Sequence, residues 1–180
     1  MADNYLENKM EEHRRAAGGA LPRRYSPLGQ KRGTACFELG EKAVFVAGCA
    51  TSPEVAKAIV GALGGAGLRV AFVWDDMKAG RALAQTTSTR HYPFAEADCG
   101  KARAMFEAEC GCIDADILIS NDGVTMDYEG AAIRIEARCD AEVFASAVGQ
   151  LALYLMLPLS RSFGLDSVAV GQDGSTTIVK

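Results

Sequence analysis

A strand–helix–strand pattern in the first half of the chain constrains its fold more than any other feature of the sequence. The apolar run Ala43–Ala47 has the length of a buried strand in a parallel sheet. A turn at 48–52 follows, and Pro53 suits the first position of a helix that ends at the glycines near 65. A second apolar run, Arg69–Trp74, completes a βαβ unit of about 32 residues. The unit predicts a parallel sheet with helices packed against it.

The same alternation continues along the chain. We expect an extended third segment at 91–94, strands at 115–120 and 175–179, and helices over 77–85, 100–111 and 141–163. Residues 124–137 predict either a half-buried strand or a hairpin, and residues 167–179 either one final strand or a hairpin around Gln172–Gly174. The predicted fold class is α/β, a three-layer, Rossmann-like, doubly wound parallel sheet of about five strands in the order 3-2-1-4-5.

Charge divides the chain into two parts. Residues 1–32 hold seven basic and four acidic side chains, a net charge of +3. Because the net charge of the whole chain is −4, the other 148 residues have a net charge of −7. Residues 1–33 predict a helix followed by a Gly- and Pro-containing linker, and residues 34–180 predict the Rossmann-like domain. We expect the basic N-terminal arm either to remain solvated or to dock on an acidic partner surface.

Composition excludes several classes of protein. Hydrophobic residues make up 49% of the chain and charged residues 23%, as in globular domains, and the net charge of −4 argues against a nucleic-acid binder. The apolar part of segment 141–163 is too short to span a membrane, and the charged N-terminus does not resemble a secretion signal, so we expect a cytoplasmic protein. The spacing of Cys110 and Cys112, with His13 and His91 far apart, predicts no metal site.

Four junctions between the predicted elements have a familiar pattern, at Val46–Glu54, Gly67–Asp75, Ala97–Cys99 and Asp116–Gly123. In this order and spacing they resemble the short-chain dehydrogenase/reductase family, whose Rossmann fold binds NAD or NADP. The resemblance covers residues 42–180 and corresponds to the first part of the family's fold. The chain is therefore similar to a truncated and degenerate member of that family.

The resemblance implies six cofactor-binding residues: Gly48, Ser52, Asp75, Asp98, Asn121 and Gly123. In the family, the turn at 48–54 cradles the pyrophosphate, and an acidic residue at Asp75 (or Asp76) holds the ribose of NAD. Ser52 and Glu54 stand where that turn has glycines, and a carboxylate at a helix start competes with phosphate for the positive end of the helix. NAD is the possible cofactor, weakened by these two residues. The simpler reading is that Pro53 and Glu54 only start a helix well, Asp75 only ends a strand, and Asn121 only bonds its own backbone.

The family's catalytic pair, a tyrosine and a lysine four residues later, has no counterpart in the domain. Pro158 follows Tyr154 at that spacing, and Ala132 follows Tyr128. The one match, Tyr5 with Lys9, lies in the N-terminal arm, and we interpret it as chance. A tyrosine without a neighbouring cation is a poor base at neutral pH. The sequence therefore predicts no catalytic residue.

These observations leave three functional hypotheses. The first is a non-catalytic binding or scaffold subunit, which pairs with itself or with a paralogous subunit through the apolar helix 141–163, as the family does. The second is an NAD(P)-dependent oxidoreductase whose missing groups come from a partner or from unusual residues. The third is a flavodoxin-like domain, which strand order would distinguish from the first two. Substrate identity is not encoded in any of these motifs.

Overall fold

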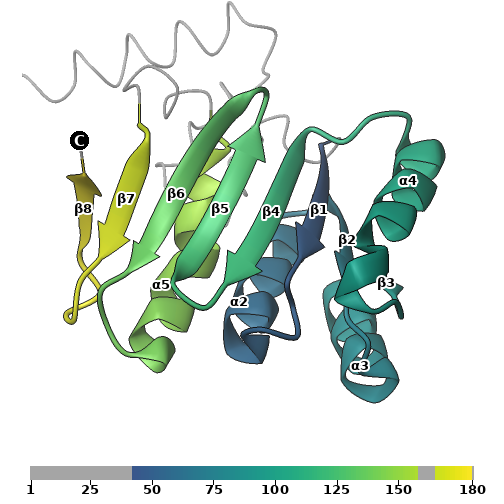
Figure 1. Ribbon diagram of the computed structural model, residues 1–180, viewed down its shortest axis with the longest axis horizontal. Coiled ribbons are helices and arrows are strands. Elements are labelled where there is room, and N and C mark those ends of the chain that lie inside the picture. The colour runs from purple at the N-terminus through teal and green to yellow at the C-terminus, as the bar shows by residue number, and fades with distance from the viewer. Residues whose placement is uncertain (1–41, 158–164, 180) are drawn as a thin grey trace, which may run out of the picture. The chain divides into compact units, whose positions relative to one another are not determined.

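One mixed β-sheet organises the part of the chain that the computed structural model describes, residues 42–157 and 165–179. Its eight strands lie in the order β3-β2-β1-β4-β5-β6-β7-β8 (Figure 1). The strands are β1 (Ala43–Ala47), β2 (Arg69–Val73), β3 (Arg90–Tyr92), β4 (Ala115–Ser120), β5 (Gly123–Tyr128), β6 (Ala131–Ala137), β7 (Ser167–Val170) and β8 (Thr176–Val179). The helices are α2 (Pro53–Gly65), α3 (Met77–Thr87), α4 (Cys99–Cys110) and α5 (Ala141–Leu155), with a 3-10 turn, η1, at Glu96–Asp98. The α/β fold class is confirmed.

The first four strands form the parallel part of the sheet. Strand β1 pairs in parallel with both β2 and β4, and β3 pairs in parallel with β2. The chain thus reverses its direction of travel across the sheet between β1 and β4, which creates a topological switch point at their carboxyl ends. A flavodoxin-like order places the third strand beside the first, so the observed order excludes that hypothesis.

The prediction of a wholly parallel sheet of about five strands is wrong. Strands β4, β5 and β6 form an antiparallel meander, and β7 and β8 form a hairpin, although β6 and β7 pair in parallel. The physical reason is the short connections, because two-residue turns can join only antiparallel neighbours. Glu129 and Gly130 both have positive φ angles, 51° and 81°, as the tight turn of a hairpin requires. Both hairpin alternatives at 124–137 and 167–179 are therefore confirmed.

Helices cover both faces of the sheet at the parallel strands. Helices α2 and α5 bury one face, where the core includes Val46, Ile117 and Ile135. Helix α4 buries the other face over β1 and β2, where Phe106 joins the cluster around Phe45. This gives the predicted three layers at β1 and β2. Beyond β4 the side chains on the face shared with α4 are exposed and mostly polar, as at Thr125, Asp127 and Arg134.

Helix α5 packs closely against α2. A Cβ atom at Gly149 would approach the backbone oxygen of Ala58 to 2.5 Å, so the glycine allows the two helices to touch. The sheet buries further apolar residues of α5, and the residues left exposed on its outer side are mostly polar. These are Glu142, Ser146, Gln150 and Tyr154. The apolar residues of α5 are thus mostly used inside the domain, and a dimer through the helix 141–163 stays a prediction.

Several predictions fall outside the described residues. The arm over 1–33, its boundary at 34, the Tyr5–Lys9 pair and the end of the predicted helix at 158–163 all lie there. In the described ranges, 42–157 and 165–179, no helix combines the length and apolarity that crossing a bilayer requires.

Candidate functional site

Two cavities open at the carboxyl edge of the parallel strands, one on each side of the β1–α2 turn. Cavity A, of about 140 Å³, lies over the ends of β1 and β2. Cavity B, of about 420 Å³, lies between the start of α2, the β4–β5 turn and the start of α5. Ligands of open α/β sheets bind in a crevice at this edge, next to the switch point. The two cavities therefore form the candidate site.

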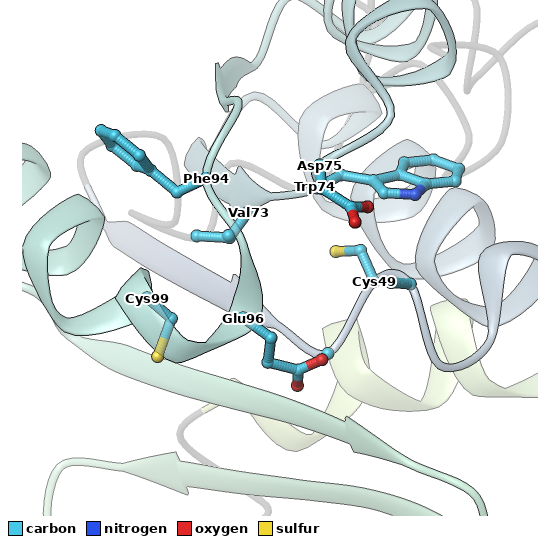
Figure 2. Close-up of a pocket in the computed structure, with 9 residues that line it drawn as sticks. Cys49, Val73, Trp74, Asp75, Phe94, Glu96 and Cys99 are labelled. Atoms are coloured by element: carbon cyan, nitrogen blue, oxygen red, sulfur yellow. The ribbon is translucent and has the colours of Figure 1, made fainter.

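Cavity A combines apolar walls with two carboxylates. Val73 and Phe94 line it together with Asp75 and Glu96. In Figure 2 the side chains of Asp75, Glu96 and Cys49 extend into the region between the strand ends, whereas the indole of Trp74 points away from it. The side-chain carboxylates of Asp75 and Glu96 form no hydrogen bond or ion pair with any residue that the structure describes. Both carboxylates are thus free to accept hydrogen bonds from a ligand.

The sequence left open whether Asp75 or Asp76 would face a ligand, and the structure separates their roles. Asp76 is the N-cap of α3, where its Oδ1 atom accepts hydrogen bonds from the backbone N–H groups of Lys78 and Ala79, both at 2.9 Å. Such a cap satisfies two donors that the helix itself cannot. The carboxylate of Asp76 therefore caps α3, and Asp75 is the residue that lines cavity A.

The floor of cavity A contains a thiol that stays protonated. Cys49 is 1% exposed, and burial raises the pKa of its thiol to about 12, with a further contribution from the negative charge of Glu96. A thiolate is the nucleophilic form of cysteine. Cys49 is therefore suited to packing beneath a ligand and not to attacking one.

We expect Cys49 to resist alkylation in the folded chain. A pH of 8 lies well below the pKa of the Cys49 thiol, and the thiol is buried. Iodoacetamide should therefore label the exposed Cys112 at least about a hundredfold faster than Cys49. Peptide mapping after timed quenching measures both rates. The same experiment in urea provides the control, in which the two rates should converge. Equal labelling of the folded chain would contradict the buried position of Cys49.

Cavity B joins the starts of two helices. Ser52 and Asp140 are the N-caps of α2 and α5, and neither side chain makes a capping hydrogen bond. Asn121 and Gly123 contribute the β4–β5 turn, and Cys139 lies beside Asp140. Burial raises the pKa of the Cys139 thiol, and the charge of Asp140 raises it further. The cavity offers polar atoms from three segments that are far apart in the sequence.

The turn between the cavities depends on Gly48 for a reason that the sequence did not reveal. Gly48 has φ +78°, and a Cβ atom there would lie 2.1 Å from the backbone oxygen of Ile119 in β4. The glycine lets the β1–α2 turn pass over the neighbouring strand. Its presence is explained by packing within the sheet, with no need of a phosphate.

The start of α2 offers an anion fewer donors than a glycine-rich loop. Pro53 has no N–H group. The backbone N–H of Ala56 donates a hydrogen bond to the backbone oxygen of Ser52 at 3.0 Å. Glu54 points outward, with its side chain 62% exposed and 3.6 Å from Lys57. The carboxylate of Glu54 therefore lies toward solvent and Lys57, and Pro53 leaves the start of α2 with one N–H donor fewer.

The six predicted residues divide between the two cavities, with one exception. Gly48 and Asp75 line cavity A, whereas Ser52, Asn121 and Gly123 line cavity B. Asp98 lines neither, because its carboxylate pairs with Lys101 at 2.6 Å at the start of α4. The role of Asp98 as a cofactor-binding residue stays a prediction. Gly123 has a packing role, since a Cβ atom there would lie 2.2 Å from the backbone oxygen of Ile135.

Among the lining residues that sequence reasoning missed are Cys49, Glu96, Cys139 and Asp140. Cys49 directly follows the glycine of the first turn, and Asp140 directly precedes a predicted helix, so position gave a signal for these two. Glu96 and Cys139 had none, because their place depends on how β3 and β6 are aligned in the sheet.

A tyrosine–lysine pair does exist in space, at the opposite edge of the sheet. Lys42, just before β1, lies 5.2 Å from the ring centre of Tyr128, which pairs with the first residue of β4. Burial lowers the pKa of Lys42, but hydrogen bonds with Tyr128 and Glu129 outweigh that effect and raise it. The ammonium group also lies 3.5 Å from Asp114. The pair stabilises the amino edge and lies away from both cavities.

In the described residues, neither cavity is lined by tyrosine, lysine or histidine. The polar groups of the site are carboxylates, hydroxyls, an amide and thiols, which can bind a ligand through hydrogen bonds and van der Waals contact. No protein-family model matches the chain, and no curated protein sequence matches it.

Proposed function

We propose that this chain is a non-catalytic binding subunit of the short-chain-dehydrogenase type, which holds the nucleoside end of a ligand in cavity A. The observation that carries the proposal is the position of Asp75, two residues after the end of β2 and beside the turn at Gly48, with no side-chain partner among the described residues. A carboxylate at this place accepts hydrogen bonds from two ribose hydroxyls in nucleotide-binding α/β folds. The Rossmann-like strand order 3-2-1-4 supports the same assignment.

The size and charge of cavity A favour a nucleoside without a phosphate on its ribose. At about 140 Å³ it is smaller than the pockets of about 300–1,000 Å³ that enclose drug-sized ligands, so it suits the nucleoside end of a ligand better than a whole dinucleotide. Asp75 and Glu96 would repel a phosphate on that ribose by about 1 kcal/mol or more. The ligand class is therefore adenosine-like or NAD-like, and NADP is disfavoured.

We expect the start of α2 to bind a pyrophosphate only weakly. A helix start binds anions through free N–H groups, and Pro53 removes one of them. The pyrophosphate of NAD should consequently add little to the binding of its adenosine part. This separates the proposal from the oxidoreductase alternative, in which the pyrophosphate supplies much of the affinity.

Calorimetric titration with adenosine, NAD and NADP tests the proposal. We expect adenosine and NAD to bind with dissociation constants within about threefold of each other, and NADP about tenfold more weakly. Asp75→Ala should weaken adenosine binding about tenfold, because it removes hydrogen bonds to a charged acceptor. Asp127→Ala, an exposed carboxylate on the open sheet face, is the matched control and should change nothing.

Two results would contradict the proposal. If none of the three compounds binds, cavity A is not a nucleoside site. If NAD binds far more tightly than adenosine, the start of α2 is a working phosphate cradle, and the oxidoreductase alternative becomes the better account.

A further inference from the structure

Two thiols separated by one glycine end helix α4. Cys110 is the last residue of the helix, Gly111 turns the chain with φ +86°, and Cys112 follows in an exposed position. The Sγ atom of Cys110 lies 2.8 Å from the backbone oxygen of Cys112 and donates a hydrogen bond to it. Both cysteines are free. The half-buried thiol of Cys110 is thus already directed toward the residue that carries the exposed one.

The spacing of these cysteines along the chain allows a disulfide between them. Disulfides join Cα atoms that are usually about 4.4–6.8 Å apart. Two consecutive residue steps span at most about 7 Å when extended, and the left-handed turn at Gly111 shortens this span. Open space surrounds Gly111, where an added Cβ atom would meet nothing within 4 Å. The chain spacing and the turn at Gly111 are therefore compatible with a disulfide between Cys110 and Cys112.

We propose that Cys110 and Cys112 form a dithiol–disulfide exchange site for small disulfides of the glutathione type. The exposed Cys112 attacks as a thiolate, one sulfur of oxidised glutathione binds to it, and the other glutathione leaves as a thiol. Cys110 then attacks the Cys112 sulfur, forms the intramolecular disulfide and releases the second glutathione. Two protein thiols lose two electrons and two protons, and one oxidised glutathione becomes two reduced molecules.

This site is independent of the nucleoside proposal. Cys99, at the start of α4, lines cavity A, and Cys110 is at the other end of the helix. A twelve-residue helix separates its two ends by about 16 Å. Failure of either proposal therefore leaves the other unchanged.

Peptide mapping of the full chain tests the exchange. The reduced protein is incubated with oxidised glutathione, quenched with acid, alkylated and digested with trypsin, which places both cysteines in the single peptide 104–134. We expect this peptide to become two hydrogens lighter and to lose its alkylation. Cys110→Ser should trap glutathione on Cys112, whereas Cys112→Ser should leave Cys110 as an alkylated thiol. Cys99→Ser, at the far end of the helix, should retain the crosslink.

The same reaction in urea shows whether the folded turn matters. Since the turn at Gly111 positions the thiols, we expect the crosslinked fraction to fall severalfold in the unfolded chain at the same glutathione ratio. The proposal is overturned if the folded wild-type peptide carries only alkylated thiols or stable glutathione adducts. It is also overturned if the folded and unfolded chains crosslink equally.

Discussion

Replacing Gly48 with alanine should destabilise the folded chain by about 3 kcal/mol or more. The added Cβ atom would lie 2.1 Å from the backbone oxygen of Ile119, and the residue would keep a positive φ angle that alanine disfavours. Because the obstacle is the backbone of β4 and not a flexible side chain, the strand or the turn must move. Equilibrium unfolding in urea measures the change as a shift of the midpoint.

Gly67→Ala is the matched control for this prediction. Gly67 also has a positive φ angle, +86°, but an added Cβ atom meets nothing within 4 Å. Gly67→Ala should lower the free energy of unfolding by about 1 kcal/mol, the cost of a positive φ angle at alanine. If the two variants are destabilised equally, the close approach of the β1–α2 turn to β4 does not exist in solution.

Gly149→Ala should destabilise the chain by about 2 kcal/mol, although alanine is the better helix former. An added Cβ atom would lie 2.5 Å from the backbone oxygen of Ala58 and 3.2 Å from Cβ of Ala62, so α5 must move away from α2. Overpacking of this kind costs about 1–3 kcal/mol. Urea unfolding again provides the measurement.

The control for Gly149 lies on the partner helix. Gly61 is in the middle of α2, and a Cβ atom added there contacts nothing within 4 Å. Gly61→Ala should therefore stabilise the chain by up to about 1 kcal/mol, the ordinary difference in helix propensity. The two glycine-to-alanine changes have opposite expected signs. Stabilisation by both would show that α2 and α5 are not in close contact.

Local pattern predicted the parallel half of the fold well and the second half less well. The strands at 43–47 and 115–120 and the helix beginning at Pro53 follow from apolar runs and a helix-start signal, and the structure confirms them. The prediction of a fifth parallel strand was wrong because the strand–helix alternation indicated that a helical crossover would place the next strand beside β4, whereas two short turns follow β4 and lead into antiparallel strands. The residue pattern over 124–137 did not distinguish a single strand from a hairpin, and in the structure a turn at Glu129 and Gly130 divides this segment.

The candidate site was only partly predictable. Gly48, Ser52 and Asp75 follow strands or start a helix, so their shared edge follows from the parallel topology. Their division into two cavities did not, because it depends on the β4–β5 turn and on the start of α5. Asp98 shows the reverse case, since its place in the chain resembles that of a binding residue while its carboxylate pairs with Lys101 and lines neither cavity.

Comparing the backbone amide NMR spectra of the chain titrated with adenosine and with NAD tests the central claim most directly. The claim is that cavity A holds a nucleoside while the start of α2 no longer holds a pyrophosphate. Both ligands should shift the amide signals of Gly48, Cys49 and Asp75, and NAD should add no further shift at Glu54 or Val55. Large shifts at Glu54 and Val55 with NAD alone, or no shift in cavity A with either ligand, would contradict the account.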